Sequence, residues 1–196
     1  MKTKIQKYFK NRKVFCAAST HYNEEKIIGK LHLILKKKFK NLLTILIPRH
    51  INRSADIKEV LSKFKLKVSE RSKGIRPSPD CDIYLVNTYG EMSKFLRLSK
   101  VTFVGGSMVN HGGQNPLEAV RMGNYVMHGR KIDNFKEIYE ELKKVKISSE
   151  IKNIDQMKKI FLKNHNYKTS KNKLNKINYL GNKIFENNIK EIKSYL

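Results

Sequence analysis

The segment VFCAASTHYNEEKIIGKLHLILKKKFKNLLTILIPRH (Val14–His50) decides the fold class, because strand, helix and strand patterns follow one another in it. Its first residues, VFCAA, form a short apolar run that is typical of a buried strand. A helix is predicted from about Glu24 to Phe39, where apolar side chains recur at the spacing of one helix face. LLTILI (Leu42–Ile47) is almost continuously apolar, as expected for a parallel strand covered on both faces, and Pro48 ends it. The segment therefore predicts a βαβ unit.

The same alternation continues to about Ser149. Further strands are predicted at Leu66–Ser69, Asp82–Val86, Val101–Gly105 and Tyr125–Gly129. Ser54 is expected to cap the helix that follows the second strand. Six strands with intervening helices predict an α/β fold, a Rossmann-like doubly wound parallel sheet.

Composition divides the chain into three parts. Residues 1–12 are expected to be a flexible lead-in, and residues 13–149 the Rossmann-like domain. Residues 150–196 are rich in Lys and Asn and show weaker helical periodicity. We expect a helical C-terminal tail there that packs on the domain or on a missing N-terminal domain.

The loop after the predicted strand at Val101–Gly105 is the most informative, because ligands of open parallel sheets bind beyond the carboxyl ends of the strands. In GGSMVNHGGQNPLE (Gly105–Glu118), small residues let backbone amides approach a ligand. Asn115, Pro116 and Glu118 fit the N-cap, N1 and N3 positions of the next helix. Two interpretations stay open: a plain capping box, or a helix start that attracts an anion such as phosphate.

Two other loops carry charged residues at the same edge. Arg49 follows a buried strand, where a guanidinium can hold phosphate through two hydrogen bonds; an ordinary surface arginine is the alternative. His50 is a neutral donor, a phosphate contact or a loop residue. Glu91 either stabilises the dipole of the helix after Asp82–Val86 or accepts hydroxyl groups of a ribose or sugar.

Several classes of site are excluded by missing motifs. The chain has no GxGxxG after its first strand, no P-loop and no serine nucleophile elbow. Cys16 and Cys81 lie in apolar surroundings and are expected to act as small core residues. His21 and His111 lie in loops at the predicted edge, but their spacing matches no metal-binding pattern. We therefore expect no metal and no other cofactor.

The chain is strongly basic, with 42 Lys+Arg against 17 Asp+Glu and a net charge of +25. Such a charge attracts nucleic acid, an anionic membrane face or a phosphorylated ligand, and it also fits a compositional bias on a solvated surface. No apolar run approaches the roughly 20 residues that span a bilayer. A chain of this kind is expected in solution or peripherally on a membrane.

Four loop motifs, in their order, identify a family. The segments AASTHYNEE, LIPRHINR, NTYGEM and FVGGSMVNHGGQNPLEAV resemble the C-terminal half of the Kdo transferases. These glycosyltransferases of the GT-B architecture attach 3-deoxy-D-manno-octulosonic acid (Kdo) to lipid A precursors in lipopolysaccharide biosynthesis. The resemblance runs from about Val14 to Glu140 and implies that residues 13–149 form a nucleotide-sugar-binding domain whose donor is CMP-Kdo.

The resemblance also implies site residues. The residues expected to contact CMP are Pro48, Arg49, Tyr89, Gly90, Glu91, Asn115, Pro116, Leu117 and Glu118. Within this set, Glu118 is expected to bind the ribose hydroxyls, and Arg49 with the helix start at Asn115 the phosphate. Further donor contacts are expected at Ser19, His21, His50, Gly106 and Ser107. The chain departs from the family pattern at Tyr89, Gln114 and Ala119, none of which removes a charged contact.

The acceptor site and the catalytic base belong to the N-terminal half of that family, so no catalytic residue is expected in this chain. The resemblance implies a bacterial cytoplasmic protein, peripheral at the inner membrane, that needs an N-terminal domain for transfer. Two alternatives stay open. One is a basic nucleic-acid-binding module, although no nucleic-acid motif is present; the other is a folded but inactive relative held near an anionic leaflet.

Overall fold

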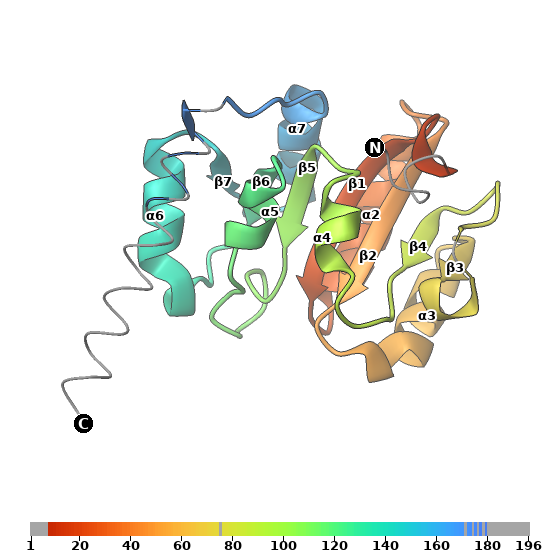
Figure 1. Cartoon of the computed structure of the whole chain (residues 1–196). Coiled ribbons are helices and arrows are strands. Elements are labelled where there is room, and N and C mark those ends of the chain that lie inside the picture. Colours follow the sequence, from red (N-terminus) through yellow and green to blue (C-terminus); the bar gives the residue numbers. More distant parts are fainter. Residues whose placement is uncertain are drawn as a thin grey trace.

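Seven parallel strands form one sheet in the computed structural model, which describes residues 8–74, 76–170, 172, 173, 175, 177 and 179 (Figure 1). The strands are β1 (Lys13–Thr20), β2 (Leu42–Pro48), β3 (Val68–Glu70), β4 (Ile83–Leu85), β5 (Val101–Val104), β6 (Tyr125–His128) and β7 (Ser148–Glu150). Their order across the sheet is β3-β4-β2-β1-β5-β6-β7. This arrangement confirms the predicted Rossmann-like α/β class.

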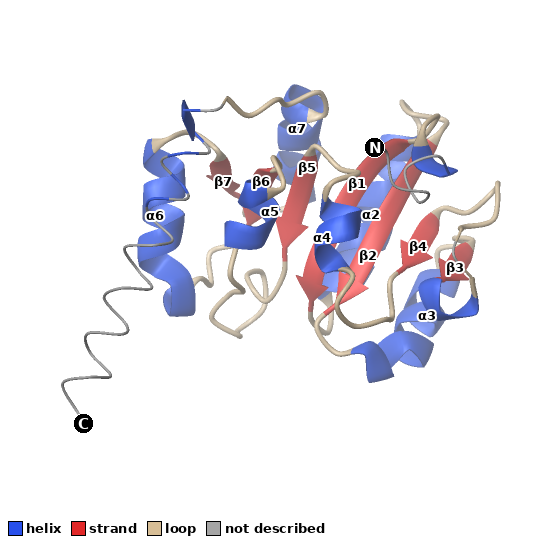
Figure 2. Cartoon of the chain, in the orientation of Figure 1, coloured by secondary structure: helices blue, strands red, loops and turns tan. Residues whose placement is uncertain are grey.

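Helices connect the strands, as a parallel sheet requires (Figure 2). The α-helices are α2 (Glu24–Lys36), α3 (Ser54–Ser62), α4 (Met92–Leu96), α5 (Leu117–Arg121), α6 (Lys136–Lys144) and α7 (Ile154–Asn164). Three short 3-10 helices are η1 (Ile51–Arg53), η2 (Arg71–Lys73) and η3 (Asp133–Phe135). The first βαβ unit matches the sequence prediction closely, with α2 starting at the expected residue and ending three residues earlier.

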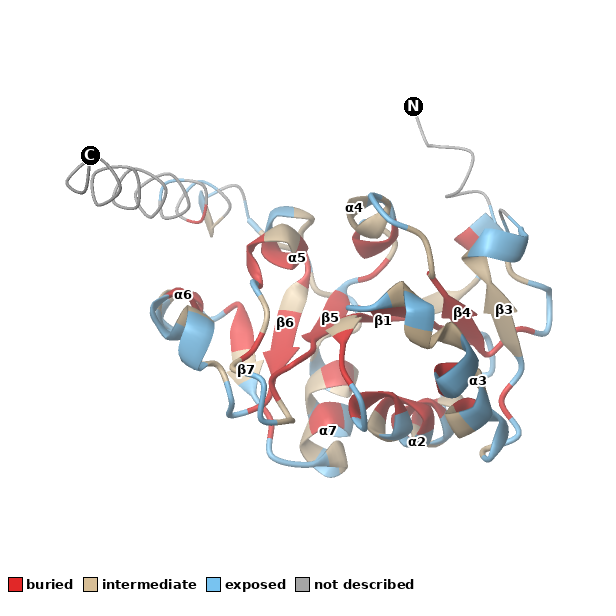
Figure 3. Ribbon diagram, turned by 90° about the horizontal axis from the view of Figure 1, so that it is seen from below, coloured by how far each residue is buried: buried red, intermediate tan, exposed pale blue. Residues whose placement is uncertain are grey.

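The sheet separates two apolar cores, because alternate strand residues point to opposite faces. Figure 3 shows α2, α3 and α7 on one side of the sheet and α4 and α5 on the other. Phe15 and Ala17 of β1 pack with residues of α2, α3 and α7. Cys16 and Ala18 face the other side, where α4, α5 and α6 lie. Each fully buried side chain of leucine size stabilises the fold by about 1.5–3 kcal/mol. Cys81 is also buried and both thiols are free, which agrees with the predicted core roles.

The order in which strands are added to the sheet reverses between β1 and β5. From β1 the strands proceed through β2 to β4 and β3, whereas β5, β6 and β7 extend on the other side. The loop after β1 leads to α2 on one face of the sheet, and the loop after β5 leads to α5 on the other face. Ligands of open α/β sheets bind beyond the carboxyl ends of the strands at such a switch point. All four family-like loop motifs follow β1, β2, β4 or β5 and therefore lie at this edge, the lower one in Figure 1.

The structure corrects two local predictions. Ser54 does not cap α3: its backbone is already helical (φ −57°, ψ −36°), and its hydroxyl donates to the carbonyl of Ile51 at 2.5 Å. The helical backbone starts earlier because η1 leads directly into α3. A seventh strand, β7, pairs with β6 although its sequence SSE lacks an apolar pattern.

The last part of the chain is described in part. Helix α7 packs against α2, and its Met157 and Phe161 are buried on that face of the sheet. The further helices predicted toward residue 196 lie largely outside the described residues, as does most of the predicted lead-in. Among the described residues no helix has the length and apolarity needed to cross a membrane.

A buried histidine joins α2 to the sheet. His32 is fully buried, with its Nδ1 2.9 Å from Thr44 Oγ1 and its Nε2 3.4 Å from the carboxylate of Asp82. Asp82 also pairs with Lys36. Burial lowers the pKa of His32 from 6.5 to about 4, outweighing the attraction of Asp82. The imidazole is therefore neutral in the folded chain at pH 7.

His32→Gln is expected to weaken the pH dependence of stability. Between pH 6.5 and pH 4 the unfolded chain binds a proton at His32 that the folded chain excludes, so the unfolding free energy falls as the pH is lowered through this window. The non-titrating glutamine removes up to about 1.4 kcal/mol per pH unit from that slope. Urea unfolding at pH 7, 6, 5 and 4.5 measures it. Equal slopes for the two proteins would show that His32 is not the group responsible.

Candidate functional site

The loops that follow β1 and β5 are held together by the buried carboxylate of Glu24, the first residue of α2. One oxygen accepts the N–H groups of His21 (2.9 Å) and Gly106 (2.8 Å). The other accepts those of Ser107 (3.1 Å) and Met108 (3.0 Å). Burial raises the pKa of Glu24, while the four N–H donors oppose this by favouring the ionised form. A single side chain thus fastens the loop after β5 to the loop after β1.

The glycines of the loop after β5 allow this contact. A Cβ atom at Gly105 would lie 2.7 Å from a carboxylate oxygen of Glu24 and would collide with the carbonyl of Ser19. Gly106 has a φ of +68° and packs beneath the ring of His21. The amides of Gly106 and Ser107 therefore already serve Glu24. Any ligand contact at these two residues must use other atoms.

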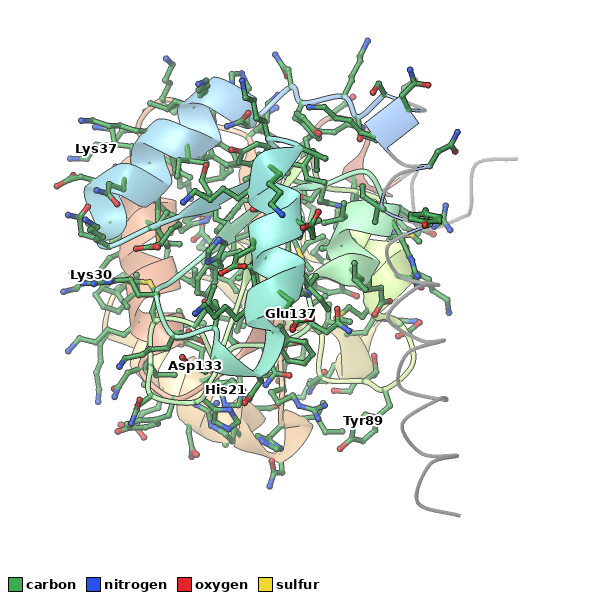
Figure 4. The ribbon with its side chains drawn as sticks, turned by 90° about the vertical axis from the view of Figure 1, so that its left-hand side faces the viewer. His21, Lys30, Lys37, Tyr89, Asp133 and Glu137 are labelled. Atoms are coloured by element: carbon green, nitrogen blue, oxygen red, sulfur yellow. The ribbon has the colours of Figure 1, made fainter. Side chains whose placement is uncertain are left out.

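Three histidines from three loops gather over this anchor. The ring centroid of His21 lies 3.8 Å from that of His111 and 5.9 Å from that of His50. His21 is 6% exposed, whereas His50 and His111 are exposed. Figure 4 shows His21 at the lower edge of the molecule, on the same side as Asp133 and Tyr89. We refer to His21, His50 and His111 as the histidine cluster.

The environment of the histidine cluster is positively charged. Burial lowers the pKa of His21 to about 4, and repulsion from His111, His50, Arg53 and Arg49 adds to the effect. The side-chain amide of Gln114 lies 3.2 Å from His21 Nε2. Within the described residues, no group of three or more His, Cys, Asp or Glu side chains is arranged to hold a metal ion.

The loop after β2 supplies two arginines with different roles. Pro48 is buried at the end of β2, and Arg49 next to it is exposed. The backbone N–H of Arg49 donates to the carbonyl of Thr20, but its guanidinium has no hydrogen-bond or ion-pair partner among the described residues. Arg53, in contrast, forms a two-point ion pair with the buried Glu25, at 3.0 and 3.2 Å. Arg49 is thus the arginine of this loop that is available to an incoming anion.

The loop after β4 is held by a carboxylate. Glu91 accepts two hydrogen bonds from Arg71, at 2.8 and 2.9 Å, and one from Thr88 at 2.7 Å. These contacts lower the pKa of Glu91 to about 2, Arg71 being the main cause. Tyr89 beside it is 78% exposed, and Gly90 has a φ of +72° with open space around it. The backbone of this turn is accessible, while the carboxylate is engaged.

The start of α5 keeps one of the two hydrogen bonds of the predicted capping box, although the helix begins at Leu117 and Pro116, predicted as its first residue, precedes it. The side-chain oxygen of Asn115 accepts the N–H of Leu117 at 2.9 Å, the bond expected from an N-cap residue. Pro116 and Leu117 are buried. The Glu118 side chain does not complete the capping box: its carboxylate forms no hydrogen bond or ion pair with any described residue, and partial burial raises its pKa. The capping box is therefore incomplete, and the Glu118 carboxylate is free to accept.

Sequence reasoning missed three residues that shape this edge. In the sequence, Glu24 looks like an ordinary acidic residue in the first turn of a helix, and Arg53 looks like an ordinary basic residue of a loop. Arg71 lies twenty residues before its partner Glu91 in a turn-rich segment. No local pattern marks such pairs. The predicted residues nevertheless lie in loops at one edge, and direct contacts link the loops after β1, β2 and β5.

Comparisons with known proteins place the chain among the glycosyltransferases. The chain is 38% identical over 135 residues to 3-deoxy-D-manno-octulosonic acid transferase from Haemophilus influenzae, which covers 69% of this chain and 32% of that protein. It is 30% identical over 192 residues to the Rickettsia bellii transferase of the same name, covering 98% of this chain and 41% of that protein. The chain thus spans about a third to two fifths of the length of these relatives. No family model matches it.

A solved structure has the same fold. The C-terminal CMP-Kdo binding domain of WaaA from Acinetobacter baumannii superposes with a TM-score of 0.75 at 30% identity, covering 80% of this chain and 82% of that one. Fold and loop motifs together define a Rossmann-like domain of a GT-B glycosyltransferase. The chain belongs to the family of 3-deoxy-D-manno-octulosonic acid transferases, with its likeness to the C-terminal domain.

Glu24→Gln is expected to destabilise the chain by at least about 2 kcal/mol, because a glutamine amide can replace only one of the two accepting oxygens and leaves buried N–H groups unpaired. Urea unfolding gives the value. Glu59→Gln, at a glutamate with a 72% exposed side chain on α3, is the matched control and should change stability by less than about 0.5 kcal/mol. Equal losses in both variants would contradict the anchoring role of Glu24.

Proposed function

We propose that this chain binds the donor CMP-Kdo and serves as the donor-binding part of an enzyme that transfers Kdo to a lipid A precursor. The observation that carries the proposal is the structural similarity to a CMP-Kdo binding domain, at 30% identity and a TM-score of 0.75. In this chain the strand order places all four loop motifs at one edge of the sheet. The basic nucleic-acid-binding alternative gains no support from the comparisons. No metal or other cofactor takes part in the proposed binding.

In this proposal CMP lies across the carboxyl ends of β1, β2, β4 and β5. Arg49, the unpaired guanidinium, takes the phosphate together with the helix start at Asn115. Glu118, partly buried and without a partner, accepts the ribose hydroxyls. Pro48, Pro116 and Leu117 give the pocket apolar walls. At the turn of Tyr89, Gly90 and Glu91 the contact is made by the ring and the backbone, since the Glu91 carboxylate holds Arg71.

Transfer itself is proposed to need residues outside this chain. A general base must remove the proton of the acceptor hydroxyl while the donor domain stabilises the departing phosphate. The donor site described above offers cations for the second task. The acceptor, a lipid A precursor, and the base belong to the other part of the enzyme. In this proposal the protein works in the bacterial cytoplasm, peripherally at the inner membrane.

Arg49→Ala and Glu118→Ala are each expected to weaken CMP binding by about tenfold or more, since each removes a charge-assisted contact. Isothermal titration calorimetry with CMP, UMP and AMP measures affinity and base preference. Arg97→Ala is the control, because Arg97 ends α4 at the opposite edge of the sheet and should leave binding within twofold. Unchanged CMP affinity in both site variants, or equal binding of AMP, would refute the proposed site.

Membrane contact is proposed for the outer surface of α2. A shallow apolar depression there is lined by Leu33, Ile34, Phe64 and Ile154 and rimmed by Lys30, Lys36, Lys37 and Lys40. Lys30 and Lys37 point away from the molecule in Figure 4, and Leu33 is 38% exposed. An apolar floor with a lysine rim suits an anionic lipid surface.

Replacing Lys30 and Lys37 together by Glu is expected to reduce binding to vesicles that contain phosphatidylglycerol by about tenfold or more. Sedimentation with vesicles of increasing phosphatidylglycerol content measures the bound fraction. The matched control replaces Lys136 and Lys143, which are exposed on α6 with the same spacing of seven residues. Equal loss in both double variants would show a nonspecific effect of net charge instead of a membrane-facing surface.

A further inference from the structure

None of the proposed CMP contacts is made by the histidine cluster. The proposed function gives the phosphate to Arg49 and the helix start at Asn115, and the ribose hydroxyls to Glu118. Yet three imidazoles from three separate loops meet at the same edge, two of them with ring centroids 3.8 Å apart. Such convergence is not required by the sheet, because Glu24 already fastens the loops after β1 and β5 through backbone contacts.

The cluster also lacks an acidic partner in its own loops. Both oxygens of Glu24 face away into the backbone amides of residues 21 and 106–108. Glu25 is bound at both oxygens by Arg53. Burial and the surrounding positive groups lower the pKa of His21 to about 4, so this imidazole is held neutral. A buried ring surrounded by cations and imidazoles is suited to receive a negatively charged group.

The chemistry of the donor supplies a second anion in the right place. Kdo is an octulosonic acid, so its carboxylate is attached to the anomeric carbon that also carries the phosphate ester. A pocket for the carboxylate must therefore adjoin the pocket for the phosphate. Arg49, the proposed phosphate ligand, is followed directly by His50, and both act on His21. The histidine cluster occupies the position that this geometry requires.

We propose that His21, His50 and His111 bind the carboxylate of the donor sugar and thereby select a sugar acid over CMP alone or a CMP-linked neutral sugar. This inference rests on the proposed function. His50 and His111, which are exposed, donate to the carboxylate through their ring N–H groups. His21 supports them from beneath: it packs against His111, and the amide of Gln114 holds its Nε2. Gly106, which admits no side chain without crowding His21, leaves room for that ring.

The test compares CMP-Kdo with CMP on the full chain. Calorimetric affinities are measured for the wild-type chain, for the double variant His50→Ala/His111→Ala, and for the control His165→Ala at the end of α7. Both cluster residues chosen are exposed, so the fold should persist, and thermal unfolding checks it. We expect the double variant to lose about tenfold or more in affinity for CMP-Kdo and to bind CMP within twofold of the wild-type chain. His165→Ala should change neither.

The outcomes separate the inference from the proposed function. If the wild-type chain binds neither CMP nor CMP-Kdo, the proposed function fails and this inference with it. If wild-type binding is intact but the double variant loses CMP and CMP-Kdo equally, the cluster belongs to the nucleotide pocket and carboxylate selection is refuted. Unchanged affinity for both ligands refutes it as well. Only a selective loss of CMP-Kdo affinity supports it.

Discussion

The buried carboxylate of Glu24 is the contact on which the ligand-facing edge depends. Parallel strands fix the sheet, but they leave the loops beyond their carboxyl ends without regular hydrogen bonds. Glu24 supplies four acceptor contacts to N–H groups that would otherwise be unpaired in a buried place. Because these donors belong to the loops after β1 and β5, one side chain sets the relative position of the two loops at the point where the strand order reverses.

Three acidic residues at this edge of the sheet bind groups of the chain itself, so their negative charges are compensated. Glu24 binds backbone amides, Glu25 binds Arg53, and Glu91 binds Arg71. The guanidinium of Arg49 has no such partner among the described residues, and its charge acts on His21 together with those of His50 and His111. The edge therefore presents cations while three of its carboxylates are engaged by internal partners. Glu118 is the exception, a carboxylate at the start of α5 without a partner in the described part of the chain.

Periodicity predicted most of the fold, and pairing across loops could not be predicted. The apolar runs of β1, β2, β5 and β6 and the stripe of α2 are strong local signals. Strand β7 was not predicted, because its three residues, SSE, show no apolar periodicity and its pairing comes from the tertiary fold. The residues of the proposed site were predicted from the order of the motifs, and their ligand contacts stay a prediction. Their partners Glu24 and Arg71 could not be predicted, because the sequence of a first helical turn or of a loop does not show whether its charged residue is paired.

The glycine-rich loop after β5 shows how a correct motif can have a different physical cause from the one that its composition suggests. Small residues there were expected to let amides approach a ligand. In the folded chain, position 105 has no room for a Cβ atom because Glu24 and the backbone of β1 lie against it. The amides that follow Gly105 donate to Glu24. In the proposed donor site, recognition at this loop therefore uses side chains, those of His111, Gln114, Asn115 and Glu118. Substituting these side chains tests ligand binding, whereas substituting the glycines tests the anchor of the loop.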